Sequence, residues 1–263
     1  MRRINIANMA TYKKRRYKPK TKEDKASKIE EQSTTAEVFN TLDEGASKTE
    51  EWVIANQKYI FIVVGLAAVM VLGYLGYTRL IHAPKQSEAM NEMYQAQQYF
   101  DDAVAGIEKD SMFTLALNGG NGKFGMLDIA KEYSGTKAGN LANYYAGIAY
   151  LNLKDYQNAV SYLSEFKSDD EILGPIAKGS IGDAFVQLNQ PEDALDYYVQ
   201  AAEMKSNEFT TPTYLYKAGT VALKLGKNAD ALKYFKRIKD DFPSSTEATN
   251  IDVFIGRAEA ASN

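Results

Sequence analysis

Few residues in this chain could perform chemistry. The 263-residue sequence contains no cysteine and one histidine, His82. The lack of cysteine excludes disulfide frameworks, thiol nucleophiles, cysteine-ligated zinc and iron–sulfur clusters. A single histidine excludes multi-histidine metal sites and argues against a Ser-His-Asp triad. We interpret His82, which lies just beyond an apolar stretch, as an interfacial side chain rather than a general base.

Two polar motifs resemble ligand sites but lack the required pattern. Residues 118–123 read NGGNGK, whereas a P-loop needs Gly, four residues and then Gly-Lys-Ser/Thr, so Leu117 and Phe124 occupy the wrong places. The acidic run at residues 169–171 lacks the further ligands that a metal site needs, and we interpret it as a solvent-exposed connection between helices. The sequence therefore predicts no catalytic residue, metal site, cofactor or small-molecule substrate, and we do not expect an enzyme.

The strongest signal in the sequence is a charge-free stretch. Residues 59–78 read YIFIVVGLAAVMVLGYLGYT, between Lys58 and Arg79. A helix of ~20 residues is about 30 Å long, the thickness of a bilayer hydrocarbon core. A buried core helix is the alternative, but soluble cores rarely carry such a stretch apolar on every face. A cleaved signal peptide is disfavoured, because the stretch exceeds the ~7–15 apolar residues of such peptides.

Charge is distributed unevenly around this stretch. Residues 1–28 hold 11 Lys and Arg against 2 Asp and Glu, while residues 79–263 hold 18 against 25. Lys and Arg are equally frequent near the two ends of the charge-free stretch, so they do not decide its orientation. The more distant basic cluster at residues 1–28 favours a cytoplasmic N-terminus. We expect a disordered basic cytoplasmic tail at 1–46, a juxtamembrane and transmembrane helix at 47–82, and an extracytoplasmic domain at 83–263.

The tail and the apolar stretch each offer a further contact. The basic cluster could bind anionic lipid, or could bind RNA on a ribosome through stacking tyrosines, although setting the topology is the simpler interpretation. Gly65, Gly73 and Gly76 fall near one helix face, where small residues let a second membrane helix approach. They do not form a GxxxG motif.

Beyond the apolar stretch the sequence repeats with a period of 35 to 37 residues. Each unit has a glycine, an alanine twelve residues later, and a large side chain four residues after the alanine. Small residues on two helices allow a close approach, and the large side chain fills the remaining gap. Fixed periods of this size indicate stacked units that bury each other's apolar faces. The aligned sets are Gly147, Ala159 and Leu163; Gly182, Ala194 and Tyr198; and Gly219, Ala231 and Phe235.

These spacings resemble the tetratricopeptide repeat, a helix pair of ~34 residues. The resemblance implies an all-α fold, in which a single N-terminal transmembrane helix is followed by an α-solenoid of tetratricopeptide-like helix pairs. Clear repeats are expected near 140–173, 175–210 and 212–245, with a capping helix at 246–260. Residues 128–133 look like the second helix of a degenerate earlier unit. An accidental pattern in a non-repeat bundle is the alternative.

In this family the first helix of each pair lines a concave surface, so the resemblance implies a partner-binding groove. The positions are mostly aromatic, apolar and neutral, and they lack the Lys/Asn/Arg cluster that clamps a C-terminal carboxylate. An apolar or amphipathic peptide, or a partner's helix, fits better. Ile148 and Val186 could instead pack between units. The implied groove residues are Tyr144, Ile148, Asn152, Asp183, Val186, Gln187, Tyr216, Thr220 and Lys224.

The layout as a whole resembles the YfgM-type ancillary subunits of the bacterial SecYEG translocon, including residues 131–139 (KEYSGTKAG) before the first clear repeat. The resemblance implies a single-pass protein of the bacterial inner membrane with a periplasmic repeat domain. It would act at the translocon with a membrane-anchored periplasmic prolyl isomerase-type chaperone, engaging partner or emerging polypeptides. The longer basic tail departs from that family. A scaffold for another envelope machine, in cell-wall or outer-membrane biogenesis, is the alternative.

Overall fold

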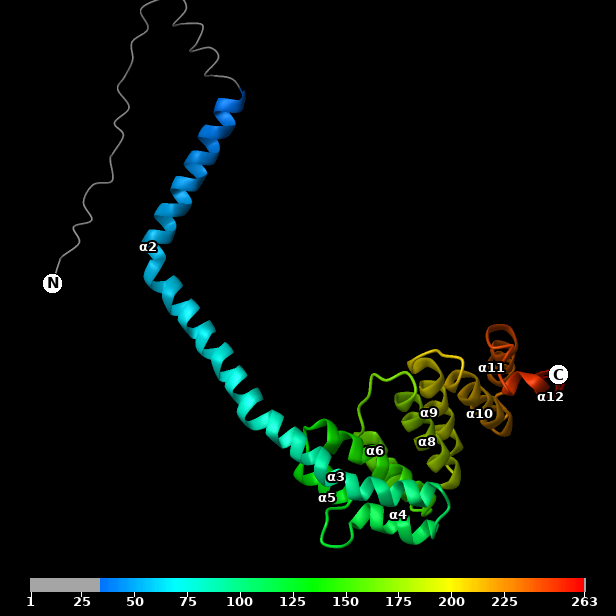
Figure 1. Ribbon diagram of the computed structural model, residues 1–263. Helices are drawn as coiled ribbons and strands as arrows, with labels where there is room; N and C mark the ends of the chain where they lie inside the picture. Colours follow the sequence, from blue (N-terminus) through cyan, green and yellow to red (C-terminus); the bar gives the residue numbers. More distant parts are fainter. Residues whose placement is uncertain (1–33, 263) are drawn as a thin grey trace, which may run out of the picture. The chain divides into compact units, whose positions relative to one another are not determined.

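The computed structural model describes residues 34–262, with side chains from Glu50 onward. Every regular element within that range is helical. The described chain divides into two units within its first long helix, α2 up to Tyr74 and the remainder from Leu75 (Figure 1). The fold is therefore all-α, with one long apolar helix followed by a helical repeat region, as expected from the sequence.

Helix α2 runs from Thr34 to Tyr77. It begins earlier than residue 47, where the juxtamembrane helix was expected to start, so residues 34–46 are helical. Thr34 and Glu37 have the spacing of a capping box, which favours a helix start at this point. The expected disorder of residues 1–33 lies outside the described residues.

The apolar side chains of α2 are exposed within this chain. Val69 and Leu72 are 67% and 68% exposed, and Phe61 is 64% exposed. In the part of the chain that the structure describes, one continuous helical stretch, Glu50–Val104, is long and apolar enough to cross a membrane. It contains the exposed apolar side chains of α2.

A five-residue π-helical turn, Thr78–His82, joins α2 to α3 (Ala83–Val104). Pro84 has no N–H, so it cannot donate to the turn before it. The N–H of Ala83 instead donates to the carbonyl of Thr78, five residues back. The helical path therefore continues through the proline with one widened turn.

The rest of the domain is built from short helices that pack against their sequence neighbours (Figure 1). The pairs from α6 to α11 fall at the three expected repeats, and α12 takes the place of the capping helix. The bounds are α4 Lys109–Asn118, α5 Met126–Glu132, α6 Lys137–Asn152, α7 Tyr156–Glu165, α8 Leu173–Gln187, α9 Pro191–Met204, α10 Thr210–Lys224, α11 Asn228–Asp241, a 3-10 turn Glu247–Asn250 and α12 Ile251–Ser262.

The turns inside the three pairs share one backbone geometry. Lys154, Asn189 and Gly226 occupy equivalent positions with φ of 65°, 58° and 72°. In each turn the N–H of the next residue donates to a carbonyl five residues back, at 2.9 Å in all three. This bond satisfies a carbonyl at the end of the first helix. Glycine and asparagine adopt the left-handed conformation at low cost, whereas lysine is strained there.

Each helix pair closes over its aligned glycine. A Cβ placed on any of these glycines would lie within 3.0 Å of the large side chain on the second helix, closer than real Cβ contacts. The pairs are Gly147 with Leu163, Gly182 with Tyr198, and Gly219 with Phe235.

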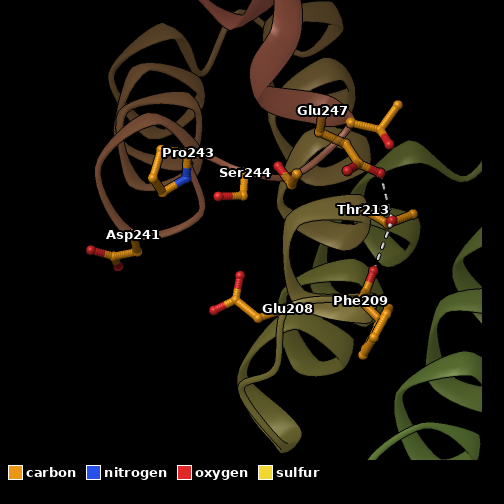
Figure 2. Close-up of a pocket in the computed structure, with 9 residues that line it drawn as sticks. Glu208, Phe209, Thr213, Asp241, Pro243, Ser244 and Glu247 are labelled. Atoms are coloured by element: carbon orange, nitrogen blue, oxygen red, sulfur yellow. Dashed lines mark hydrogen bonds between the residues drawn. The ribbon is translucent and has the colours of Figure 1, made fainter.

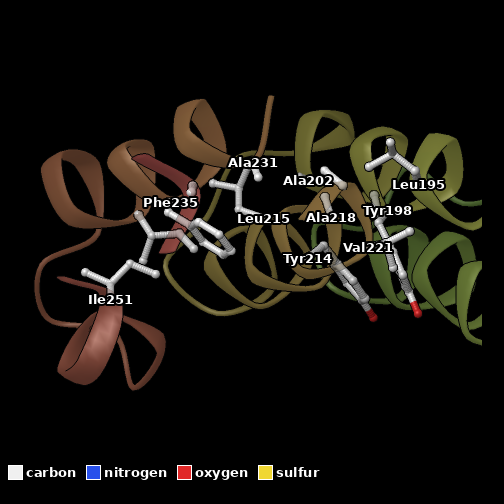
Figure 3. Packing of buried hydrophobic residues seen from close by; sticks show 14 of the residues in the cluster. Leu195, Tyr198, Ala202, Tyr214, Leu215, Ala218, Val221, Ala231, Phe235 and Ile251 are labelled. Carbon is white, nitrogen blue, oxygen red and sulfur yellow. The ribbon is translucent and has the colours of Figure 1, made fainter. Parts of the chain in front are cut away.

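The C-terminal core spans α9 to α12 (Figure 3). Phe235, Leu215 and Ile251 are almost fully buried within it. The rings of Tyr198 and Tyr214 stack with centroids 6.3 Å apart and planes 17° from parallel. A second large cluster joins α3, α4, α5 and α6. The repeats therefore hold one another by contacts between neighbours.

We expect Gly219→Ala to destabilise the protein by about 1–3 kcal/mol, because the added methyl collides with the Phe235 ring. Gly256→Ala, at a helical position with no heavy atom within 4 Å, is the matched control and should be neutral or stabilising by about 0.5–1 kcal/mol. Thermal unfolding of the full chain in detergent micelles measures both. Equal effects at the two glycines would contradict the close approach of α10 and α11.

Candidate partner-binding surface

A pocket of about 380 Å³ opens near the C-terminal ends of α6 and α8. It contains four of the nine expected groove residues, Asn152, Asp183, Val186 and Gln187. Its other lining residues are Leu151, Lys154, Tyr156 and Tyr198. The first helices of two successive repeats therefore contribute to one hollow.

The other expected residues of α6 pack inside the domain. The ring of half-buried Tyr144 lies 5.2 Å from that of Phe166 and 5.8 Å from that of Tyr145, between ring centroids. Ile148 is partly buried against both the N-terminal and the central apolar clusters. Ile148 thus has the packing role that the sequence left open for it.

The expected residues of α10 do not line the pocket. The ring of Tyr216 meets that of Phe254 edge-on at 5.0 Å, and it lies 6.2 Å from that of Phe235. The Thr220 hydroxyl donates to the carbonyl of Tyr216 at 2.9 Å, and Lys224 is exposed. Helix α12, which carries Phe254, therefore covers the aromatic side chain at this end of the surface.

Asp183 is the centre of a polar cluster beside the pocket. Lys217 Nζ donates to its two carboxylate oxygens at 2.7 and 2.8 Å, and the Tyr198 hydroxyl donates to Oδ1 at 2.6 Å. The Lys217 ammonium also lies 5.6 Å from the ring centroids of both Tyr198 and Tyr214, a cation–π geometry. The cluster links α8, α9 and α10 and compensates the charge of Asp183.

Burial sets the protonation of the two tyrosines in this cluster. It raises the pKa of Tyr198, and the hydrogen bond to Asp183 and the charge of that carboxylate act in the same direction. Burial also raises the pKa of Tyr214, again with a contribution from Asp183. Both phenols stay neutral around pH 7, so Tyr198 remains a hydrogen-bond donor to Asp183.

Lys217 and Tyr214 were not predicted from the sequence. Gly179 occupies the position equivalent to Tyr144 one repeat earlier, and a Cβ there would collide with the Tyr214 ring. A glycine at a groove position is therefore the signal for a neighbouring side chain that fills the space. The second signal is the opposite charge of Asp183 and Lys217, which lie about one repeat apart.

A larger pocket, of about 710 Å³, lies where the start of α10 meets the segment between α11 and α12 (Figure 2). It contains the carboxylates of Glu208, Asp241 and Glu247. The Thr213 hydroxyl lies 2.6 Å from Glu247 Oε1 and 3.2 Å from the carbonyl of Phe209. Within the described residues, no group of three His, Cys, Asp or Glu could hold a metal ion. The acidic lining alone specifies no ligand.

The glycine face of α2 is open within the described chain. A Cβ added at Gly65, Gly73 or Gly76 would meet no heavy atom within 4 Å. The side chains of the described residues thus leave room for a second helix at this face.

The repeat region matches models of a known family. Residues 141–170 and residues 180–246 each match a tetratricopeptide repeat model. The first match covers most of α6 and all of α7, and the second extends from within α8 to just beyond α11. Repeats of this kind are generally non-catalytic modules for protein–protein interaction. No curated protein matches the chain.

We expect Asp183→Asn to lower the free energy of unfolding by about 1–2 kcal/mol, because the half-buried Lys217 ammonium loses its charged partner. Asp252→Asn removes an exposed pair with Lys239 of similar length, 2.8 Å, and should cost less than Asp183→Asn, because solvent screens exposed pairs. Urea titration of the two full-length variants gives the comparison. A cost at Asp183 no greater than at Asp252 would show that the cluster does not stabilise the repeat interface.

Proposed function

We propose that this tetratricopeptide protein is a non-enzymatic, membrane-anchored accessory subunit or chaperone scaffold at the Sec translocon. Its repeat domain would engage partner or emerging polypeptides in the periplasm, beside a membrane-anchored prolyl isomerase-type chaperone. The observation that carries the proposal is the combination of an exposed apolar helix with an adjoining repeat array that has an open pocket on its first helices.

The membrane part of the proposal is supported by α2. Water would contact the apolar side chains of residues 59–78 unless lipid or another protein covers them, and burying them is favourable by about 25 cal/mol per Å². The basic N-terminal cluster supports a cytoplasmic N-terminus and hence a periplasmic repeat domain in a bacterial inner membrane. The same cluster could add weak contacts with anionic lipid or with the ribosome.

The pocket favours a polypeptide ligand over a charged small molecule. Leu151 and Val186 offer apolar surface, while Asn152 and Gln187 offer amides that can donate to and accept from a peptide backbone. Asp183 is already paired with Lys217. A pocket that combines apolar surface, neutral amides and one basic side chain, Lys154, suits one face of an amphipathic segment.

The identity of the partners can be tested by affinity purification after crosslinking in detergent-solubilised membranes. The proposal predicts recovery of translocon subunits and of the isomerase-type chaperone. Their consistent absence, together with recovery of cell-wall or outer-membrane assembly proteins, would replace the translocon by another envelope machine.

We expect Gln187→Lys to reduce recovery of the partners that bind the repeat domain, because it places a long charged side chain in the pocket. Tyr144 and Tyr216 are less suitable positions, since their rings also pack inside the domain. The matched control is Gln200→Lys, which changes an exposed glutamine on α9, outside the pocket. Crosslinked yields are measured for both variants at equal protein levels. Equal yields would move the contact away from this pocket.

A further inference from the structure

A second hollow, of about 660 Å³, lies at the start of the repeat domain. Its lining includes three exposed large apolar side chains: Leu80 and Ile81, which are 76% and 58% exposed, and Phe124, which is 38% exposed. Phe124 comes from the loop between α4 and α5, more than 40 residues further along the chain. Two distant segments therefore present apolar side chains to one surface.

The surface adjoins the end of the charge-free stretch. Leu80 and Ile81 follow Thr78 by two and three residues, which is about 3–5 Å at the helical rise of 1.5 Å per residue. The polar layer of a bilayer extends about 5–8 Å beyond each side of the hydrocarbon core. If α2 spans the membrane, chain continuity alone places Leu80 and Ile81 at headgroup level.

The loop that carries Phe124 has a constrained backbone. Gly119 and Gly122 have φ of 80° and 71°, and Asn121 has φ of 55°. A Cβ on Gly119 would collide with the backbone around Phe124, so the loop folds back closely on itself. The Phe124 ring lies 6.3 Å from that of Tyr133. Phe124 is therefore held at this surface by a folded loop.

The charges around the hollow are mixed. Lys85 lies 5.9 Å from the ring centroid of Tyr133, and the Tyr133 hydroxyl donates to Glu88 at 3.1 Å. Asp128 and Glu132 also line the hollow, and Arg79 and Lys123 precede its apolar residues in sequence. The lining itself is acidic, with Lys85 against three carboxylates. Counting the two flanking basic residues gives three basic and three acidic side chains, a mixed surface that matches a zwitterionic headgroup layer, with the apolar side chains reaching toward the acyl boundary.

We infer that Leu80, Ile81 and Phe124 form an interfacial contact that seats the repeat domain on the headgroup layer of the membrane it is anchored in. The occupant is a zwitterionic lipid surface, and the inference rests on the proposed spanning role of α2. The contact would restrain the repeat domain near the membrane surface, the position needed to meet a segment emerging from a neighbouring pore.

Fluorescence quenching tests this contact directly. The full chain contains one tryptophan, Trp52, so Trp52→Phe gives a background for single-tryptophan variants. Phe124→Trp reports on the proposed contact, and Tyr77→Trp reports on the end of the span. Phe209→Trp, at a 77% exposed phenylalanine at the start of α10, is the remote control. Each variant is reconstituted in phosphatidylcholine nanodiscs with and without a phosphatidylcholine that carries a nitroxide on its headgroup.

The inference predicts a loss of emission for Phe124→Trp close to that for Tyr77→Trp, and little loss for Phe209→Trp. If Tyr77→Trp is quenched but Phe124→Trp resembles Phe209→Trp, the interfacial contact is wrong while the anchor stands. If Tyr77→Trp is not quenched, α2 does not span the bilayer, and the anchor and this inference both fail. Quenching of all three to one extent would show non-specific adsorption and would also overturn the inference.

Discussion

The exposed apolar surface of α2 is the constraint on which the rest of the structure depends. A stretch of 20 residues without charge cannot remain in water without a large hydrophobic cost, and the described side chains of this protein do not cover it. A bilayer would remove the cost, because the helix satisfies its own backbone hydrogen bonds and its length fits the hydrocarbon core. The repeat domain that follows would then act at a membrane surface rather than in free solution.

Close helix approach gives that domain its shape. Gly182 and Gly219 bring each pair of helices together, and the large side chains of the second helices fill the gap. The first helices then lie side by side, so that the ends of α6 and α8 form the pocket. The Asp183–Lys217 pair stabilises the next interface, between α8 and α10, without an uncompensated charge. The candidate site is thus a consequence of repeat packing.

The fold was predictable because its determinants are local and periodic. The glycine, alanine and large-residue spacing predicted a helical repeat region, and the structure contains one, with helix pairs α6–α7, α8–α9 and α10–α11. The start of α2 at Thr34 could not be predicted from composition alone, because a polar sequence such as residues 34–46 is compatible with both a helix and a tail. Helix ends depend on small free-energy differences, so their exact residues are hard to predict.

The groove was only partly predictable, because it depends on contacts between repeats. Alignment alone identified Asn152 and Gln187, and both line the pocket. Alignment also identified Tyr216, but periodicity cannot show that Phe254, on α12 after the last repeat, packs against its ring. Nor can alignment show that Tyr214 fills the space left by Gly179. Side-chain packing between units decides which positions stay open.

Site-directed cysteine labelling tests the central claim most directly, because the chain has no cysteine of its own. Glu51→Cys and Gln200→Cys place single exposed thiols on the two sides of the apolar stretch. The account predicts that a membrane-impermeant maleimide labels Gln200→Cys in intact spheroplasts, and labels Glu51→Cys only after lysis. Labelling of both thiols in intact spheroplasts, the reverse pattern, or recovery of the protein in the soluble fraction would contradict it.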